Sequence, residues 1–196
     1  MVLYTLSKRI FDIFLSLIII VLVLTWLVPL IFIITFLTTK ENPFYFQQRV
    51  GKNGKQFKIY KFRSMKGEVP ENDPLLSNEE VLRITYFGKF LRKYRIDEFP
   101  QFINVIKGEM SIVGPRPERQ FFLDQMISHI PQYKRLQKIK PGITSLGQIR
   151  FGYADNIQDM LQRARYDLKY LENYNLWTDL KIIFATIIVV FKGKGK

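Results

Sequence analysis

The sequence predicts an α+β fold that is mainly helical, with an N-terminal membrane helix followed by a small domain that carries a β-hairpin and amphipathic helices. No charged residue occurs from 13 to 39, and these 27 residues exceed the ~20 that a helix needs to cross a bilayer. Aromatic and β-branched residues flank a Gly/Asn-rich turn at 51–55, which is typical of a hairpin. Apolar residues recur at helical spacing over 157–171. We therefore expect an anchor over 1–40 and one domain over 41–196.

The composition limits the kinds of partner and site that are possible. The 196 residues carry a formal charge of +13, from 30 Lys+Arg against 17 Asp+Glu. We therefore expect an anionic partner, which is nucleic acid, lipid headgroups or a phosphorylated substrate. Cysteine is absent, which excludes disulfides and thiolate metal sites and fits a reducing compartment. His129 is the single histidine, so one chain cannot build a multi-histidine metal site.

The N-terminal apolar run is predicted to be a permanent membrane anchor. A secretory signal peptide would have a shorter apolar core, ~7–15 residues, and a small-residue cleavage site. Pro29 lies inside the run, where it removes a helical hydrogen bond and clashes with the preceding turn. Two interpretations stay open: a kinked spanning helix, or a re-entrant helix, broken near Pro29, that enters and leaves by the same face. Basic residues flank both ends of the run: Lys8, Arg9 and Lys40. If basic flanks mark the cytoplasmic side of a membrane helix, both ends lie in the cytoplasm, which favours the re-entrant helix.

Periodicity and turn signals predict the remaining elements. Strands are expected at 44–50 and 56–62, with lysines between aromatics that suit nucleic acid, headgroups or a diphosphate. Residues 67–80 hold two prolines and five acids and are predicted to be a solvated loop. Asp155 is the expected cap of one helix, and a last helix at 176–191 suits either the membrane interface or the core. The other helices are expected over 82–94, 102–108, 118–129 and 157–171.

Two adjacent carboxylates, Asp97 and Glu98, occur within the stretch RIDEFPQF of this basic chain. Pro100 is tolerated in the first turn of a helix, which would put Asp97 at or near the N-cap. Local physics alone favours that structural role, worth ~1 kcal/mol. The same geometry also suits chemistry, because a helix N-terminus attracts phosphate, two carboxylates can hold Mg²⁺, and an aspartate can attack phosphorus. Arg92, about one turn upstream, is expected to keep Asp97 ionised and to bind a phosphoryl oxygen.

The segment Gly-Pro-Arg-Pro at 114–117 is a second candidate. Pro115 and Pro117 fix the backbone on both sides of Arg116 and withhold N–H donors. A guanidinium held in this way is suited to bidentate phosphate binding. Alone, the tetrapeptide is more often a surface turn with a solvated arginine.

Together, these motifs resemble the bacterial sugar transferases, in particular the small monotopic polyprenyl-phosphate phosphoglycosyl transferases. The similarity covers nearly the whole chain. The block at 91–118 is highly specific through the order and spacing of its motifs. The segments that carry the resemblance are KRIFD at 8–12, RVGKNGKQFKIYKFRSM at 49–65, LRKYRIDEFPQFINVIKGEMSIVGPRPE at 91–118, KPGITSLGQ at 140–148, and the closing LWTDLKIIFATIIVVFKGKGK.

The resemblance implies an enzyme that transfers a phospho-sugar from a UDP-sugar to undecaprenyl phosphate, releases UMP and requires Mg²⁺. It implies a ping-pong route through a covalent phospho-sugar on Asp97, with Glu98 helping to hold the metal or to manage protons. Both acids would then be metal ligands. Lys61, Arg92 and Arg116 match family positions that line the site and bind phosphate. With the resemblance included, the dyad is expected to be catalytic rather than a helix cap.

The chain departs from the family pattern at two places. Small members usually break the anchor at Ser-Pro, whereas Pro29 here follows a valine. After Gln148 many relatives read Val-Asn-Gly-Arg, whereas this chain reads Ile-Arg-Phe-Gly. We expect Gln148 to bind substrate, with Arg150 in place of the missing arginine. The second departure concerns recognition of the nucleotide and sugar, and leaves the reaction class unchanged.

The implied location is the cytoplasmic face of the bacterial inner membrane, at the first membrane step of a surface glycan such as an exopolysaccharide or a glycoconjugate. The lipid bilayer is then a partner, nucleic acid is not, and a homodimer stays open. Two other interpretations compete. A membrane-tethered basic binding module would explain the charge, the anchor and the hairpin, but has no use for Asp97 and Glu98. A different membrane phosphotransferase, such as a phospholipid-headgroup enzyme, would release CMP rather than UMP.

Overall fold

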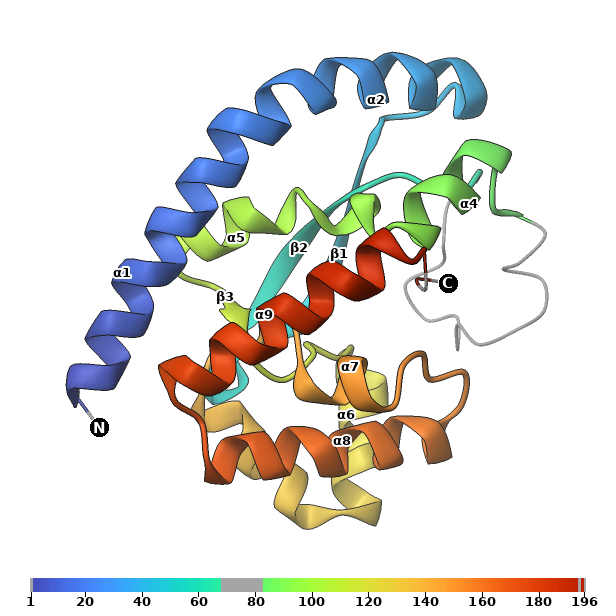
Figure 1. The fold of residues 1–196 in the computed structure, drawn as a ribbon. Helices are drawn as coiled ribbons and strands as arrows, with labels where there is room; N and C mark the ends of the chain where they lie inside the picture. Colours follow the sequence, from blue (N-terminus) through green and yellow to red (C-terminus); the bar gives the residue numbers. More distant parts are fainter. Residues whose placement is uncertain (1, 68–82, 194, 196) are drawn as a thin grey trace.

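The computed structural model describes residues 2–67, 83–193 and 195, so the acidic loop predicted at 67–80 lies almost entirely outside the described residues. As predicted, the fold is α+β and mainly helical. An N-terminal helical arch, residues 2–39, extends over a domain built from a hairpin, a small second sheet and several helices (Figure 1).

The arch is one continuous run of helix with a bend. α1 (Val2–Ile19) passes through a π-helical stretch, Ile20–Leu24, into α2 (Thr25–Thr39), and the two helices run in different directions (Figure 1). Pro29 lies within α2, so the irregular backbone precedes the proline instead of coinciding with it. Proline has no N–H for the carbonyl four residues back, and π-helical bulges and prolines are both common causes of helix kinks. The predicted interruption is therefore present, but in the turns upstream of Pro29.

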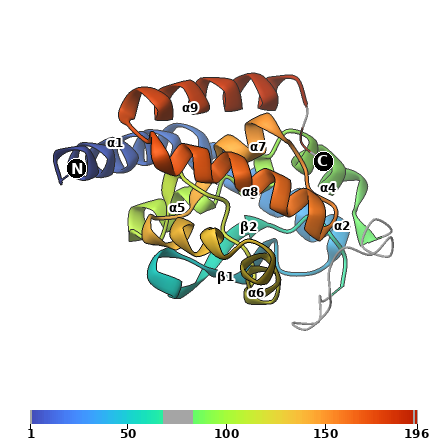
Figure 2. The same ribbon diagram turned by 90° about the horizontal axis from the view of Figure 1, so that it is seen from below.

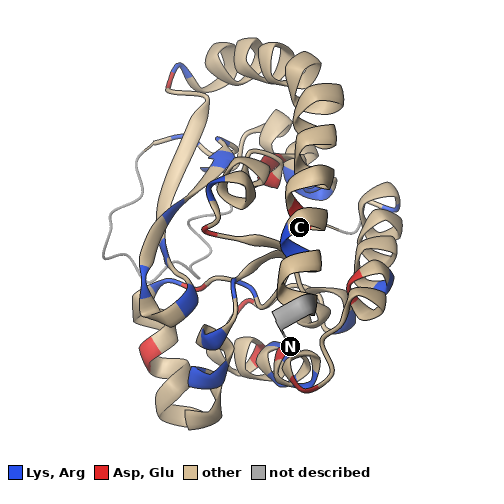
Figure 3. Cartoon of the chain, turned by 90° about the vertical axis from the view of Figure 1, so that its left-hand side faces the viewer, with Lys and Arg blue, Asp and Glu red and all other residues tan. Residues whose placement is uncertain are grey.

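Both ends of the arch contact the same domain. Tyr4–Thr39 is the one helix in the described part of the chain that is long and apolar enough to cross a membrane. Near its start, Lys8 Nζ lies 2.6 Å from Asp179 Oδ2. Just past its end, Glu41 forms an ion pair with Arg63. Charged residues gather at the ends of the arch and are absent from its middle (Figure 3). The bend thus brings both ends of the arch against the same domain.

Two small sheets form the centre of the domain. β1 (Phe44–Val50) and β2 (Gln56–Phe62) form the predicted antiparallel hairpin, with Phe44 opposite Phe62 and Val50 opposite Gln56. The turn between them adopts left-handed backbone at an asparagine and a glycine, the residue types that tolerate it. β3 (Ser111–Val113) and β4 (Gly142–Thr144) pair in parallel.

The helices surround these sheets, with α9 on one side of the domain, the hairpin on the other, and α7 and α8 between them (Figure 2). α5 ends at Gly108 as predicted, because its positive φ of 84° suits the residue after a helix. α8 is capped by Asn156, whose side chain accepts from Asp159 N at 2.9 Å, so the prediction of Asp155 as the cap was wrong by one residue. The bounds are α4 Tyr86–Lys93, α5 Gln101–Lys107, α6 Gln120–His129, α7 Leu146–Arg150, α8 Ile157–Glu172 and α9 Leu176–Phe191, with a 3₁₀ stretch at Pro131–Lys138.

Three apolar clusters hold the elements together. One joins α6, the 3₁₀ stretch and α8, and a second joins β2, α5, β3 and α9. The third joins the arch to the hairpin and α4 through Leu24, Ile31, Phe62 and Leu91, all of which are buried. The third cluster fixes α4 and the end of β2 beside the turn that follows α4, and that turn carries the two adjacent carboxylates.

Candidate active site

Asp97 and Glu98 lie in a 3₁₀ turn, Ile96–Glu98, between α4 and α5. Arg95 precedes the turn with left-handed backbone (φ 54°, ψ 23°), which is uncommon for a residue other than glycine. Neither the turn nor α5 has a side-chain cap, and the residue before α5 is Pro100. The prediction that Asp97 lies at a helix N-cap was therefore wrong, because Arg95 starts a separate turn upstream of α5. The carboxylates are not used for capping.

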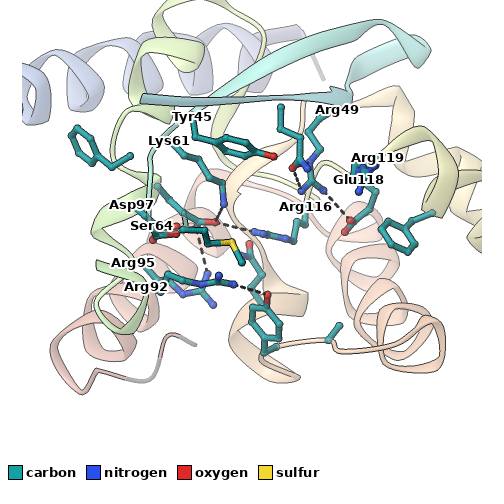
Figure 4. Close-up of a pocket in the computed structure, with 18 of the residues that line it drawn as sticks. Tyr45, Arg49, Lys61, Ser64, Arg92, Arg95, Asp97, Arg116, Glu118 and Arg119 are labelled. Carbon is teal, nitrogen blue, oxygen red and sulfur yellow. Dashed lines mark hydrogen bonds and ion pairs between the residues drawn. The ribbon is translucent and has the colours of Figure 1, made fainter. Parts of the chain in front are cut away.

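Both carboxylates line a cavity of about 210 Å³ between α4, the hairpin and the Gly-Pro-Arg-Pro segment (Figure 4). Asp97 is 8% exposed and Glu98 7%. Among the described residues of the lining, Glu118 is the other carboxylate, so positive charge exceeds negative charge in this part of the cavity. A cation-lined site of this kind is suited to phosphate groups. The cationic lining residues are Arg49, Lys61, Arg63, Arg92, Arg95, Arg116, Arg119 and Arg163.

Glu98 is held by three cations. Its Oε1 accepts from Lys61 Nζ at 2.8 Å and from Arg116 Nη1 at 3.3 Å, and its Oε2 lies 3.7 Å from Arg95 Nη1. Burial acts to raise the pKa of Glu98, but attraction to Lys61, Arg116 and Arg95 outweighs burial and holds the pKa well below its usual range. Glu98 is therefore ionised and fixed in place.

Asp97 differs from Glu98 both in its contacts and in the direction of its pKa shift. Among the described residues, no hydrogen bond or ion pair involves its carboxylate. Burial raises the pKa of Asp97 to about 6, and the charge of Glu98 adds to the rise, whereas Lys61 and Arg92 oppose it. Arg92 lowers the pKa as expected, but burial outweighs this attraction, so the pKa of Asp97 lies above its ordinary value. A carboxylate without hydrogen-bond donors keeps its lone pairs available for phosphorus or for a metal ion.

The structure brings four of the five predicted substrate-binding residues together at the cavity wall. Lys61 comes from β2, Arg92 from α4, Arg116 from the segment after β3, and Gln148 from α7. Gln148 is 4% exposed, and its Oε1 has no hydrogen-bond partner in the described part of the chain. Arg150 is exposed and does not line the cavity. Two residues along a helix turn the side chain by about 200°, so Arg150 points away where Gln148 points inward.

The Gly-Pro-Arg-Pro segment holds Arg116 as predicted. Pro115 O accepts from Gly142 N at 2.9 Å, which ties the segment to β4. Pro117 O accepts from Arg49 Nη1 at 3.2 Å, which ties it to β1. Both carbonyls that flank the arginine are therefore engaged, which holds the backbone, and the ion pair with Glu98 directs the guanidinium into the cavity.

Sequence reasoning missed a second group of buried charges, the Glu118 network, which consists of Glu118, Arg163 and Arg49. Arg163 Nη2 lies 2.6 Å from Glu118 Oε1, and Arg49 Nη1 lies 3.5 Å from Glu118 Oε2. A signal was present in the sequence, because Arg163 and Asp167 lie four residues apart on the apolar face of a helix. A charged residue on that face needs a buried partner. Asp167 accepts from Gly147 N at 2.7 Å.

The dyad fits a magnesium ion only in combination with substrate. The described residues contain no group of three or more His, Cys, Asp or Glu that could hold a metal. Mg²⁺ usually takes one or two protein carboxylates and completes its shell with water and substrate phosphates. Asp97 has free acceptor capacity, whereas the oxygens of Glu98 are shared with Lys61, Arg116 and Arg95. The pair therefore suits an ion that arrives with a diphosphate.

The family model of the bacterial sugar transferases matches residues 3–193. The chain belongs to the bacterial sugar transferase family. It is 40% identical over 170 residues to a UDP-N-acetylgalactosamine-undecaprenyl-phosphate N-acetylgalactosaminephosphotransferase of Aeromonas hydrophila, covering 85% of this chain and 40% of that protein. It is 44% identical over 193 residues to a UDP-glucose:undecaprenyl-phosphate glucose-1-phosphate transferase of Klebsiella pneumoniae, covering 95% of this chain and 40% of that protein.

A relative of Caulobacter vibrioides, with the same name as the Klebsiella protein, is 33% identical over 187 residues, covering 93% of this chain and 68% of that protein. The chain thus spans about two fifths of the length of the first two relatives and about two thirds of the third. The matched region includes the dyad, the Gly-Pro-Arg-Pro segment and the apolar arch, since the family model covers all three. The names of these three relatives agree on the lipid acceptor and differ in the sugar.

Proposed function

We propose that this chain transfers a sugar phosphate from a UDP-sugar to undecaprenyl phosphate, with release of UMP and formation of a lipid-diphosphate-linked sugar. The observation that carries the proposal is the buried Asp97 carboxylate, which has no hydrogen bond among the described residues and lies in a cavity rich in cations. The names of the relatives support the two substrate classes. Those names differ in the sugar, so the donor is left open among UDP-sugars.

Asp97 is the proposed nucleophile of a two-step reaction. In the first step one carboxylate oxygen attacks the phosphorus that bears the sugar. The bond from that phosphorus to the bridging oxygen breaks, UMP leaves, and the phospho-sugar stays on Asp97 as an acyl phosphate. In the second step a phosphate oxygen of the lipid attacks the same phosphorus, which forms the diphosphate and frees the carboxylate. Asp97 is buried but its carboxylate accepts no hydrogen bond among the described residues, which supports this role more than a structural one.

The cations around the dyad have two proposed tasks. Lys61 and Arg116 fix the ionised Glu98, and their remaining N–H groups are available to phosphoryl oxygens. Because the pKa of Glu98 is held low, this carboxylate suits the binding of cations better than the donation of a proton. Mg²⁺, when bound, would neutralise charge on the diphosphate, and Asp97 and Glu98 are the residues that would hold it.

We further propose that the arch is a re-entrant membrane helix and that the domain lies at the cytoplasmic face. Contact of both ends of the arch with one domain supports re-entry, since a spanning helix would carry one end to the far side. Large apolar side chains that are exposed on the arch and on α9 support immersion in lipid. These side chains include Leu22, Trp26, Leu37, Trp177, Phe184 and Phe191.

UMP release tests the proposed function. Purified protein in detergent receives undecaprenyl phosphate, Mg²⁺ and a panel of UDP-sugars, with Asp97→Asn in parallel. The expected result is UMP release with one or a few UDP-sugars by the wild type and none by the variant. A folded wild type that releases no UMP with any UDP-sugar, and whose binding of polyanions falls steeply with salt regardless of their identity, would instead indicate a basic binding module.

A further inference from the structure

A second cavity lies beneath the bend of the arch. It has a volume of about 280 Å³ and is formed by three elements: the arch, β1 and the start of α5. The lining is apolar except for one threonine, whose hydroxyl already donates to Val21 O at 2.7 Å within its own helix. Among the described residues, no free hydrogen-bonding side chain lines this space. We call it the bend groove, and its lining includes Leu24, Thr25, Val28, Phe44, Pro100 and Ile103.

The bend groove and the dyad cavity share a wall. Pro100 lines the groove and follows Glu98 by two residues, so the turn that carries the dyad also borders the groove. Phe44 lines the groove, and Phe62, which lies opposite it in the hairpin, lines the dyad cavity. The two rings stack with centroids 5.7 Å apart. An elongated ligand could therefore place one end in the groove and the other beside Asp97.

We propose that the bend groove binds the isoprene units nearest the phosphate of the polyprenyl acceptor, and so delivers its phosphate to the dyad. The assignment rests on the proposed function, which supplies the lipid substrate. A polyprenyl chain has no polar atom beyond its phosphate, which matches a lining without free donors or acceptors. The groove is just below the ~300–1,000 Å³ of ordinary small-molecule pockets, so it has room for the start of the chain only. The remainder of the chain would stay in the bilayer.

Position favours this occupant over an acyl chain of a bilayer phospholipid. The groove borders the turn that carries Asp97, and residues of the one membrane-length helix in the described chain form part of its lining. A lipid whose headgroup has to reach Asp97 needs such continuity, whereas a bulk phospholipid does not. The phospholipid is therefore the alternative that the experiment has to exclude.

The test fills the groove and measures each substrate separately. Ile103 is 39% exposed on α5, so Ile103→Trp adds bulk at the groove without entering a buried core. Leu30→Trp is the matched control, because Leu30 is 56% exposed on α2 and does not line the groove. Acceptors are undecaprenyl phosphate and geranyl phosphate, a short prenyl phosphate. The donor is the UDP-sugar that the wild type uses, and all assays are run in detergent.

Ile103→Trp is expected to raise the KM for both acceptors by about tenfold or more, because contact with several methylene groups is lost. Its KM for the UDP-sugar stays unchanged, and Leu30→Trp behaves as the wild type. An effect on the long acceptor alone, an equal rise in the KM for the donor, or no change in the KM for either acceptor would each overturn the assignment. Reduced turnover in phospholipid vesicles, with an unchanged acceptor KM in detergent, would assign the groove to a bilayer acyl chain and would also overturn it.

A second variant guards against a folding defect. Ile103→Ala removes contact instead of adding bulk, and it is expected to raise the KM for both acceptors by a smaller factor with an unchanged thermal midpoint. The proposed function fails separately from the groove, since its failure appears as absence of UMP release by the wild type. Wild-type turnover together with an unchanged acceptor KM in both folded variants would contradict the assignment of the groove and leave the proposed function standing.

Discussion

Two groups of buried charge lie side by side in this domain, and they are built differently. In the Glu118 network each carboxylate oxygen has a guanidinium partner, Arg163 on one and Arg49 on the other. In the dyad Glu98 is satisfied in the same way, but Asp97 has no partner among the described residues. Burial of a charge is unfavourable unless it is paired, so a structural cluster is expected to be closed. The open member of the dyad is therefore the group suited to chemistry.

The largest expected effect follows from removing the open carboxylate. Asp97→Asn keeps the shape of the side chain and removes the nucleophile, so turnover is expected to fall by on the order of 10³-fold or more. Stability should stay the same or rise, because an unpaired buried charge disappears. Arg150→Ala, an exposed change outside the cavity, is the control and should behave as the wild type. Near-normal UMP release by folded Asp97→Asn would show that the open carboxylate is not needed for chemistry, and would contradict the contrast between the dyad and the Glu118 network.

Breaking the Glu118 network is expected to lower stability, whereas Asp97→Asn is expected to lower turnover and keep stability. Arg163→Met leaves Glu118 with Arg49 as its only remaining partner in the network, and loss of one member of a buried ion pair typically destabilises by about 3–5 kcal/mol. The thermal midpoint in detergent should fall clearly below that of Asp97→Asn. Adding Glu118→Gln to Arg163→Met should recover part of the loss, since the uncompensated charge is then removed. An unchanged midpoint in Arg163→Met would show that the network is not structural.

Arg116→Lys sharpens the comparison within the dyad itself. The charge beside Glu98 is kept, but the planar fork that can bind two phosphoryl oxygens is lost. We expect kcat/KM for the UDP-sugar to fall by about tenfold, which corresponds to ~1.4 kcal/mol, with little change in the thermal midpoint. Unchanged kinetics would mean that Arg116 acts as a point charge that holds Glu98 and does not bind substrate through its fork.

The smallest expected effect concerns Asp167, which borders the Glu118 network. Burial raises the pKa of Asp167 to about 6, above the ordinary value of 3.8. Because the folded-state pKa is the higher one, the ionised form destabilises the fold above roughly pH 6, and this penalty disappears as the pH falls toward 4. Asp167→Asn can still accept from Gly147 N, so it should be more stable than the wild type at pH 7.5. Thermal midpoints that differ by the same amount at pH 7.5 and pH 4.5 would contradict the assignment.

Local features of the fold were predictable because they depend on neighbouring residues. The strands at 44–50 and 56–62 have the predicted bounds, since a Gly/Asn turn between two aromatic runs fixes both ends of a hairpin. Gly108 ends α5 for a similar local reason. The cap of α8 was misplaced because Asp155 and Asn156 are both good capping residues, and only the backbone decides between them.

The site was predictable in its members and less so in its electrostatics. Asp97, Glu98, Lys61, Arg92, Arg116 and Gln148 all line one cavity. The left-handed conformation of Arg95, which starts the 3₁₀ turn, has no local sequence signal such as glycine. The direction of the pKa shift of Asp97 depends on burial by elements far apart in the chain. The pairing of Glu118 with Arg163, 45 residues away, is likewise a property of the tertiary structure.

The most direct test of the central claim is a search for the phospho-sugar on Asp97. Wild-type protein is incubated with Mg²⁺ and the UDP-sugar that it uses, without acceptor, and its intact mass is measured before peptides are mapped. We predict a mass increase of one sugar phosphate, located on the peptide that contains Asp97, absent from Asp97→Asn, and removed when undecaprenyl phosphate is added. Wild-type protein that turns over but never carries the adduct, or that carries it on another residue, would contradict the assignment of Asp97 as the nucleophile.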